Sequence, residues 1–346
     1  MTPRIDVRAV TNTGDVWRVM VNELPDSNIA HAAEWFTAIP NAYGHEPLYL
    51  SAVDDEGRVG VLPAFIVRRP LFGTVVSSMP FLDTGGPCSE SPALAQALVE
   101  RLFTEAKRVG AKYVELRCKQ TLAIPARPAE HKVTLTLPLP ADPDRLWRGL
   151  DGSVRNQVRK AERSGLSVDV GGAEQLPAFY ETFVVRMREL GSPVHASGFL
   201  RAVFDAFGDR ARIAVIRKGS VTVGGLVTLA FKDTIVVPWA SCLQEYFSLC
   251  PNMLLYWETL RRACTGGVTS FDFGRSTRDS GTYRFKRQWG AREEPLFWYT
   301  LPTHGQPAVA APGVRHEQAI LAKVWQRLPL SFTRFGGPPI RRYLTQ

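Results

Sequence analysis

Two stretches of the chain share one alternation of apolar strands and glycine-containing turns. Residues 48–69 place an apolar run on each side of a turn with Asp54, Asp55 and Gly57, and residues 211–233 repeat a strand, a glycine turn and a strand. Each hairpin is followed by a further apolar run, a loop with proline, an amphipathic helix and one short strand. The sequence therefore predicts a duplicated structural unit.

The helices of the two copies carry apolar residues at helical spacing. They are expected within residues 93–110 and 252–267, and each precedes a short strand, at residues 112–117 and 268–275. The inward positions are Leu98, Leu102, Ala106 and Val109 in the first copy and Leu254, Trp257 and Leu260 in the second. A hairpin, a crossover helix and a strand, repeated twice, predict mixed sheets flanked by helices, an α/β or α+β fold.

The stretch between the copies is mostly helical. Asp142, followed by proline, opens a first helix, and Ser153 is expected to cap a second that Gly165 closes. Residues 174–190 have the apolar spacing of a third helix, and Ser197 opens a fourth.

Proline and aspartate in residues 137–144 favour an extended linker and suggest a domain boundary there. We expect an N-terminal domain at 1–140, a C-terminal domain with the active cleft at 141–300, and a tail at 301–346. The tail is expected to contain an amphipathic helix with an apolar stripe of Ile320, Val324, Trp325 and Leu328. Docking of this stripe on the main body is preferred over a helix on a membrane surface.

Composition supports a globular protein with two domains. The chain has 346 residues, of which 45% are hydrophobic and 22% charged. The formal net charge of +9 favours anionic partners, such as nucleotide phosphates, RNA, lipid pyrophosphates or an acidic membrane face. The first ten residues lack the apolar run of a secretory signal, and no apolar stretch is long enough to span a bilayer, so we interpret the protein as cytoplasmic, with the inner face of the membrane as a second location.

The cysteines and histidines do not indicate a metal site. Five cysteines, an odd number, occur without CxxC spacing, and buried reduced thiols are the preferred interpretation. The six histidines are scattered, and the common nucleotide, dinucleotide, zinc-protease and hydrolase motifs are absent from the sequence.

Two basic clusters are candidates for anion binding. In residues 154–164, Arg155, Arg159 and Arg163 recur every four residues on one helix face, with Lys160 beside them. A solvated basic face and an anion-binding face are equally weighted explanations. The second cluster, residues 282–292, interleaves aromatic with basic side chains, and its alternation predicts a strand, although the aromatic residues can equally belong to the core. It contains Tyr283, Arg284, Phe285, Lys286, Arg287, Trp289 and Arg292.

Two further features carry candidate chemistry. Pro251 suits the first position of a helix, and the free amides behind it, next to Asn252, can hold a phosphate or a developing oxyanion. Asp272 lies between two phenylalanines on a strand, so its side chain is expected to point away from them, and Gly274 and Arg275 follow. A carboxylate in a cleft can act as a general base, but a salt bridge to arginine is an equal alternative.

The segments RNQVRKAERSGL, SLCPNMLLYWETLRRA and FDFGRSTRDSGTYRFKRQWGA together resemble the FemAB-related branch of the GNAT superfamily. The resemblance is closest to the FemAB-like proteins associated with exosortase and PEP-CTERM exopolysaccharide systems, and extends from about His31 to the C-terminal residues. It implies two GNAT-like domains, with an acyl donor and an acceptor meeting in the cleft of the second. In the best understood relatives the donor is an aminoacyl-tRNA and the acceptor a peptidoglycan precursor.

The resemblance also implies roles for single residues. Lys286 matches a family lysine thought to stabilise the oxyanion or to hold the precursor's phosphate, and Arg155, Arg159 and Lys160 match a basic helix that faces the anionic substrate. Further candidate substrate-binding residues are Arg275, Tyr283, Arg284 and Trp289. The turn at Pro251 and Asn252 stands where ordinary GNAT enzymes carry the R/Q-x-x-G-x-G/A loop for coenzyme A, which is not found here.

The leading hypothesis is transfer of an acyl or aminoacyl group to an amine or hydroxyl of a cell-envelope or exopolysaccharide precursor that is a glycan or is lipid-linked. The acceptor attacks the activated carbonyl directly, and Asp272 assists proton removal. The donor is a co-substrate, either aminoacyl-tRNA or acyl-CoA, and neither a permanently bound cofactor nor a metal is expected. Two alternatives stay open: an acyl-CoA-dependent N-acyltransferase, and a non-catalytic protein that binds an anionic glycan or RNA on the same fold.

Overall fold

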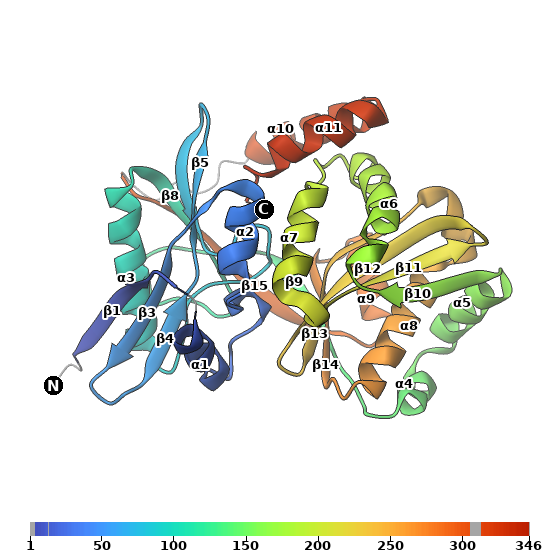
Figure 1. Ribbon diagram of the computed structural model, residues 1–346, viewed down its shortest axis with the longest axis horizontal. Coiled ribbons are helices and arrows are strands. Elements are labelled where there is room, and N and C mark those ends of the chain that lie inside the picture. Colours follow the sequence, from blue (N-terminus) through green and yellow to red (C-terminus); the bar gives the residue numbers. More distant parts are fainter. Residues whose placement is uncertain (1–3, 13, 305–312, 346) are drawn as a thin grey trace. The chain divides into compact units, whose positions relative to one another are not determined.

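The computed structural model describes residues 4–12, 14–304 and 313–345, and it divides into two compact units (Figure 1). Unit 1 comprises Met1–Val133, Pro295–Ala311 and Tyr343–Gln346. Unit 2 comprises Thr134–Glu294 and Pro312–Arg342. The chain passes between the units four times, and the first two passages lie within strands, β9 (Ala129–Pro138) and β15 (Arg292–Pro302).

The first sheet of unit 1 contains the hairpin expected at residues 48–69. Its strands follow the order β1 (Ile5–Val10), β3 (Tyr49–Asp54), β4 (Val59–Leu62) and β7 (Cys88–Ser89), all antiparallel. At the β3–β4 turn the Asp54 carboxylate accepts hydrogen bonds from the backbone N–H groups of Glu56 and Arg58, at 3.1 and 2.9 Å. This local bonding explains why the turn could be predicted from sequence.

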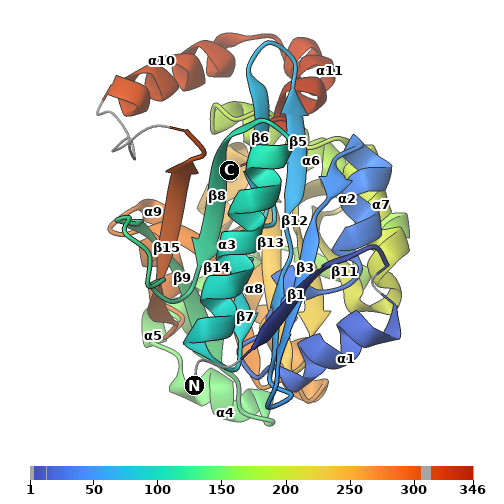
Figure 2. The same cartoon turned by 90° about the vertical axis from the view of Figure 1, so that its left-hand side faces the viewer.

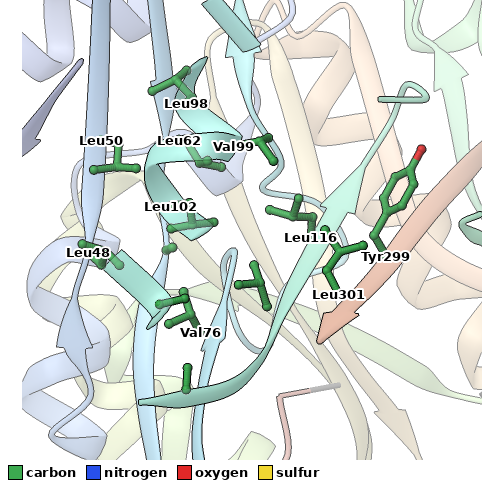
Figure 3. Close-up of a cluster of buried hydrophobic side chains, with 14 of the residues drawn as sticks. Leu48, Leu50, Leu62, Val76, Leu98, Val99, Leu102, Leu116, Tyr299 and Leu301 are labelled. Carbon is green, nitrogen blue, oxygen red and sulfur yellow. The ribbon is translucent and has the colours of Figure 1, made fainter. Parts of the chain in front are cut away.

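The second group of strands in unit 1 follows the order β15, β8 (Ala111–Cys118), β6 (Gly73–Ser77), β5 (Phe65–Arg69) and β2 (Glu46–Pro47). Helix α3 (Pro92–Arg108) connects the first copy's hairpin region to β8, and Figure 2 shows it in front of the unit 1 strands. Its side chains Leu98, Leu102 and Ala106 are fully buried, as expected, and Leu94 is buried with them, whereas Val109 is only partly buried. They pack in one core with strand residues such as Leu50, Leu62 and Leu116, and Figure 3 labels Leu98 and Leu102 in this core.

The remaining helices of unit 1 are α1 (Asp15–Glu23), a 3-10 helix (Ile29–His31) and α2 (Trp35–Tyr43). His31 is buried and fixes the loop that leads into α2. Its Nδ1 accepts from the Asn28 backbone N–H at 3.1 Å, so Nε2 carries the proton donated to the Gly86 carbonyl at 3.0 Å. This histidine therefore has a structural role in unit 1.

The buried side chain of Arg117 lies at the end of the parallel β6–β8 pair. The Arg117 guanidinium is 2% exposed and donates to the carbonyl oxygens of Met79 at 3.3 Å, Leu82 at 2.5 Å and Thr345. Its charge is balanced by Glu115 at 3.6 Å, itself bonded to Ser77. A buried charge needs such a full set of partners, so this cluster fixes the ends of both strands and the C-terminal residues.

Unit 2 contains the second copy of the repeat. Its strands follow the order β10 (Leu166–Gly171), β11 (Ala211–Lys218), β12 (Val221–Phe231), β13 (Thr234–Cys242), β14 (Ser270–Thr277) and β9. The β11–β12 hairpin is the one expected at residues 211–233, and β13 and β14 are parallel, with α8 (Pro251–Thr265) between them. The predicted order of hairpin, helix and strand is confirmed in both copies.

The helices predicted between the copies are confirmed, with one difference in capping. They are α4 (Pro143–Gly149), α5 (Gly152–Arg163), α6 (Leu176–Glu189) and α7 (Ser197–Phe207), with 3-10 helices at Ala173–Gln175, Gly208–Arg210 and Gln244–Leu249. The Asp142 side chain caps α4, as expected, and Gly165 follows α5 with a φ of 70°. However, α5 begins two residues earlier than predicted, at Gly152, so Asp151 and not Ser153 is its N-cap. Figure 1 shows α6 and α7 on the near face of this sheet and α8 on the far face, where α5 packs on α8.

The C-terminal part of the chain forms two consecutive helices, α10 (Gly313–Arg327) and α11 (Leu330–Arg341), so the helix expected in the tail is confirmed. The prediction that the apolar stripe docks on the main body is wrong for Ile320 and Val324, which are 50% and 53% exposed, whereas Trp325 and Leu328 are partly buried. Docking uses the opposite face of α10, where the Gln326 side chain donates to the Glu189 carbonyl at 2.9 Å. The expected domain limits, 1–140, 141–300 and 301–346, stay a prediction about independently folding domains.

Candidate active site

The candidate site lies in unit 2, where β13 and β14 separate. The two parallel strands pair at Thr234↔Ser270, Ile235↔Phe271 and Val236↔Asp272. Beyond this register β13 continues to Cys242 and β14 to Thr277, so both strands run on for several residues after their mutual pairing ends. Parallel strands that diverge at their carboxyl ends leave room for a ligand between them, the usual position of sites in α/β sheets.

Helix α8 begins beyond the end of β13, as the sequence predicted. Pro251 occupies the first helical position and is buried, whereas Asn252 behind it is partly exposed. Cys250, the residue before the helix, has a φ of 58°, and this left-handed conformation turns the chain sharply into α8. The first amides of α8 thus lie at the carboxyl end of the sheet, where a helix start favours negative charge.

On β14, the two predicted catalytic residues, Asp272 and Lys286, bind the backbone N–H and the carbonyl oxygen of Gly274. The Asp272 carboxylate accepts from the Gly274 N–H and from the Thr134 hydroxyl of β9, both at 2.7 Å. The Lys286 ammonium donates to the carbonyl oxygens of Gly274 and Arg275, both at 2.8 Å. Gly274 has a φ of 75°, a conformation that favours glycine, so the chain can turn between the carboxylate and the ammonium. The structure therefore brings Asp272, Arg275 and Lys286 together.

Lys286 is placed by α9 (Gly281–Arg287), and the strand predicted for residues 282–292 is therefore wrong in this part. Ser280 caps the helix, because its hydroxyl accepts a hydrogen bond from the Tyr283 N–H at 3.2 Å. This cap favours a helix more strongly than four residues of alternating aromatic and basic side chains favour a strand. The helix turns Phe285 toward Tyr256 of α8, with ring centroids 5.1 Å apart, and it buries Lys286 to 8% exposure. Only the end of the segment, from Arg292, is a strand, β15.

The other residues assigned to this cluster differ in exposure. Tyr283 donates its hydroxyl to Glu293 at 2.6 Å; this hydrogen bond raises the pKa of Tyr283 and lowers that of Glu293. Arg284 is exposed and donates to the Asp279 carbonyl at 2.7 Å. Trp289 is 1% exposed and therefore lies in the core, and its buried indole N–H has no hydrogen-bond partner among the described residues. Their roles in substrate binding stay predictions.

The predicted basic helix is α5, and it packs on α8 by way of aromatic residues. The Arg159 guanidinium lies 5.5 Å from the ring centroid of Trp147 in α4, and that ring lies 4.6 Å from Trp257 of α8. Lys160 is exposed and Arg155 partly exposed, whereas Val154 and Val158 on the other side are fully buried. The contacts of α5 thus centre on α4 and α8, and those of Lys286 on β14, so the two basic clusters are anchored separately.

The residues that support the site were not predicted from the sequence. Thr134 was missed because its partner Asp272 lies 138 residues further along the chain. Trp147 was missed as well, although an aromatic residue just ahead of a basic helix is a signal that could have been used. Gly274 was named only as a neighbour of Asp272. Its position between Asp272 and Lys286 could be seen only in the folded structure.

The two copies differ at the parallel strand pair. In unit 1 the pairing of β6 with β8 continues past Ser77, because the Ser78 N–H donates to the Glu115 carbonyl at 2.8 Å. Arg117 and the carbonyl oxygens around it then occupy the position beyond the strand ends. In unit 2 the pairing stops at Asp272, and the assigned residues follow. This difference favours unit 2 as the location of the candidate site.

The buried cysteine thiols do not fit a nucleophilic role. Burial raises the pKa of Cys242 to about 12, although Arg186 lowers it somewhat, and burial raises the pKa of Cys118 to about 12 as well. A thiol with such a pKa is almost fully protonated at neutral pH, whereas the thiolate is the nucleophile.

In the part of the chain that the structure describes, no cluster of three or more His, Cys, Asp or Glu side chains fits a metal ion. The described helices are likewise all too short or too polar to cross a lipid bilayer.

Comparison with protein families places these residues in a known domain. Residues 151–287, from α5 to the end of α9, match the family model described as an acetyltransferase (GNAT) domain. The matched segment contains Asp272, Lys286, Arg159 and the start of α8. A comparison with curated proteins gives no match.

Solved structures show the fold of the whole chain. FemX superposes with a TM-score of 0.65 at 14% identity, covering 86% of this chain and 97% of FemX. L-PGS from Bacillus licheniformis gives 0.55 at 12%, covering 91% and 98%, and a tandem GNAT protein from the clavulanic acid biosynthesis pathway gives 0.53 at 11%, covering 88% and 100%. The chain therefore has the fold of tandem GNAT proteins, and the predicted fold class is confirmed.

Proposed function

We propose that this tandem GNAT-fold protein transfers an acyl or aminoacyl group from an activated, anionic donor to an amine or hydroxyl of a cell-envelope precursor. The observation that carries the proposal is the position of Asp272, Arg275 and Lys286 around Gly274, at the point where β13 and β14 separate, inside the segment that matches a GNAT acetyltransferase domain. The similarity in fold to FemX and to L-PGS supports an envelope acceptor over other amines. Membership of the exosortase-associated branch, with an exopolysaccharide acceptor, stays a prediction.

The proposed chemistry is direct attack of the acceptor on the donor's carbonyl carbon. A bond from the acceptor nitrogen or oxygen to this carbon forms and the donor's ester or thioester bond breaks. The proton that the acceptor loses is passed on to the leaving oxygen or sulfur, which departs as the free hydroxyl or thiol. Lys286 is assigned to stabilising the charge on the carbonyl oxygen, because a buried ammonium acts in a site of low dielectric. Asp272 is assigned to accepting the proton, with Thr134 and the Gly274 N–H orienting its carboxylate.

The donor is held, in this proposal, by the first amides of α8 and by the basic face of α5. An aminoacyl-tRNA and an acyl-CoA both carry phosphates that fit such positions. Aminoacyl-tRNA is the preferred donor, since Pro251 and Asn252 replace the glycine loop that coenzyme A would require. The cytoplasm, at the inner face of the membrane, is the compartment where this donor and an envelope precursor would meet.

Purified protein can be assayed with radiolabelled aminoacyl-tRNA or acetyl-CoA and a lipid-linked peptidoglycan precursor or an amine as acceptor. We expect label to pass from aminoacyl-tRNA to the precursor. Transfer from acetyl-CoA to the amine would instead establish the acyl-CoA-dependent reaction. If tRNA or glycan binds in a salt-dependent way and neither donor is consumed, the protein is a binding protein and the proposal fails.

The basic face of α5 is tested by the double substitution Arg155→Gln, Arg159→Gln. We expect KM for the anionic donor to rise about tenfold and kcat to stay the same, because exposed charges of this kind contribute up to about 1 kcal/mol each. The dependence of KM on salt should weaken as well. A matched control is Arg201→Gln, Arg262→Gln, which removes the same charge from exposed positions on α7 and α8. Equal KM values for the two double variants would show that α5 does not contact the donor.

A further inference from the structure

Helices α10 and α11 expose an apolar face that the proposed reaction does not use. On α10, Ile320, Leu321 and Val324 are 50%, 68% and 53% exposed. On α11, Phe332 and Phe335 are 55% and 76% exposed, although phenylalanine is among the residues most often found buried. Apolar side chains gathered in this way on consecutive helices indicate an interaction surface.

The apolar side chains of α10 point away from the body of unit 2. The helix is held on the C-terminal end of α6 through Gln326, and its last turn through Leu328, whose carbonyl accepts from the Arg188 guanidinium at 2.7 Å. Ala322, one turn before Gln326, lies against Gly191. At about 100° per residue, Val324 lies opposite the midpoint of Ala322 and Gln326, and Ile320 and Leu321 lie within roughly 60° of it. The exposed stripe is therefore the outer face of a firmly attached helix.

The same arrangement holds for α11. Thr333, Gly337 and Arg341, spaced four residues apart, are buried against unit 2, and the Arg341 guanidinium lies 3.0 Å from the buried His195 imidazole. Arg334 forms an ion pair with Glu181 of α6. Phe335 lies about 160° around the helix from Thr333, on the outer side. The Trp325 and Phe332 rings, 6.4 Å apart, connect the two helices at their junction.

The charge of this segment identifies its partner. Between Ile320 and Arg342 every charged residue is basic: Lys323, Arg327, Arg334, Arg341 and Arg342. Lys323 and Arg327 are exposed and flank the apolar stripe of α10 on the side of Ile320. An apolar face bordered by lysine and arginine is typical of helices that lie in the interface of an anionic bilayer, where the apolar residues enter the acyl boundary and the cations meet lipid phosphates.

We propose that the outer face of α10 and α11 binds the surface of anionic lipid bilayers, with Ile320, Leu321, Val324, Phe332 and Phe335 inserted and Lys323 and Arg327 at the headgroups. This attachment is separate from acyl transfer, because neither donor nor acceptor takes part in it. It would place unit 2 at a membrane surface whichever acceptor the protein uses.

The full-length protein can be tested by co-sedimentation with vesicles of phosphatidylcholine that contain 30% phosphatidylglycerol, and with vesicles of phosphatidylcholine alone. The protein should bind the anionic vesicles, and Phe332→Ser, Phe335→Ser should weaken this binding by at least tenfold. Lys323→Gln, Arg327→Gln should weaken it about tenfold at low salt and reduce its salt dependence. The side chains are exposed, so the variants should fold normally, as circular dichroism can verify.

Val16→Ser, Val19→Ser is the matched apolar control, because these residues are 76% and 51% exposed on α1. Arg201→Gln, Arg262→Gln is the charge control; both double variants should bind vesicles like the unaltered protein. Failure of the unaltered protein to bind anionic vesicles, or equal binding by the phenylalanine variant, would overturn the proposal. A dimer in sedimentation velocity that the phenylalanine substitutions dissociate would also overturn it, since a second copy would then cover this face.

Discussion

Replacing Lys286 with methionine should lower kcat for acyl transfer by about 10²–10³-fold, the usual effect of removing one oxyanion-stabilising donor. Methionine keeps most of the side-chain volume but cannot donate to the Gly274 and Arg275 carbonyl oxygens. The β14 turn would therefore loosen at the same time, and stability must be measured beside activity. Steady-state kinetics at 25 °C and thermal unfolding of the same preparation give both quantities.

The kinetic pattern distinguishes the catalytic role from a structural one. If Lys286 stabilises the transition state, kcat falls while KM for both substrates changes little. Lys286→Arg should recover part of kcat, because the charge is kept in altered geometry. Lys218→Met is the matched control, since it removes an exposed lysine that donates to a backbone carbonyl in the same unit. An unchanged kcat in folded Lys286→Met would remove Lys286 from the mechanism.

Replacing Arg117 with methionine should destabilise unit 1 by about 3–5 kcal/mol, because a buried Glu115 loses its counter-charge. The carbonyl oxygens of Met79, Leu82 and Thr345 lose a hydrogen-bond donor in the same change. The expected result is a lower denaturant midpoint for the transition that includes unit 1. It can be followed by tryptophan fluorescence, to which Trp298 contributes, whose ring centroid lies 5.1 Å from the guanidinium carbon.

Arg108→Met is the control for this prediction. Arg108 also forms an ion pair with a glutamate, Glu105, at 2.7 Å, but its own side chain is 72% exposed. Glu105 is buried but keeps a second ion pair with Arg101 at 2.8 Å, and the Arg108 guanidinium is exposed, so the loss of this pair should cost only about 0–1 kcal/mol. Similar midpoints for Arg117→Met and Arg108→Met would mean that the buried cluster contributes little to stability.

The sequence predicted those elements whose signals are local. The β3–β4 turn depends on Asp54 and its next few residues, and α3 and α8 show their buried faces through spacing alone. For this reason the duplicated unit could be recognised without a structure. By contrast, α9 was mistaken for a strand, because four alternating residues fit both patterns and only the Ser280 cap distinguishes them.

The site was predicted less completely than the fold. Asp272 and Lys286 were selected, yet the sequence could not show that one binds the backbone N–H and the other the carbonyl oxygen of the same residue, Gly274. Arg117 gave no signal at all, because its partner Thr345 lies 228 residues away. Contacts between distant residues are set by the topology, and spacing along the chain contains no information about them.

The way the chain is threaded through its two units has a consequence for its synthesis on the ribosome. Residues 134–294 form one continuous stretch that holds most of unit 2, whose remainder is Pro312–Arg342. Unit 1 instead combines Met1–Val133 with β15 and with Tyr343–Gln346. Arg117 therefore leaves the ribosome long before Thr345, which accepts one of its hydrogen bonds, has been synthesised. Until then the Arg117 guanidinium needs water or a chaperone as its interim partner.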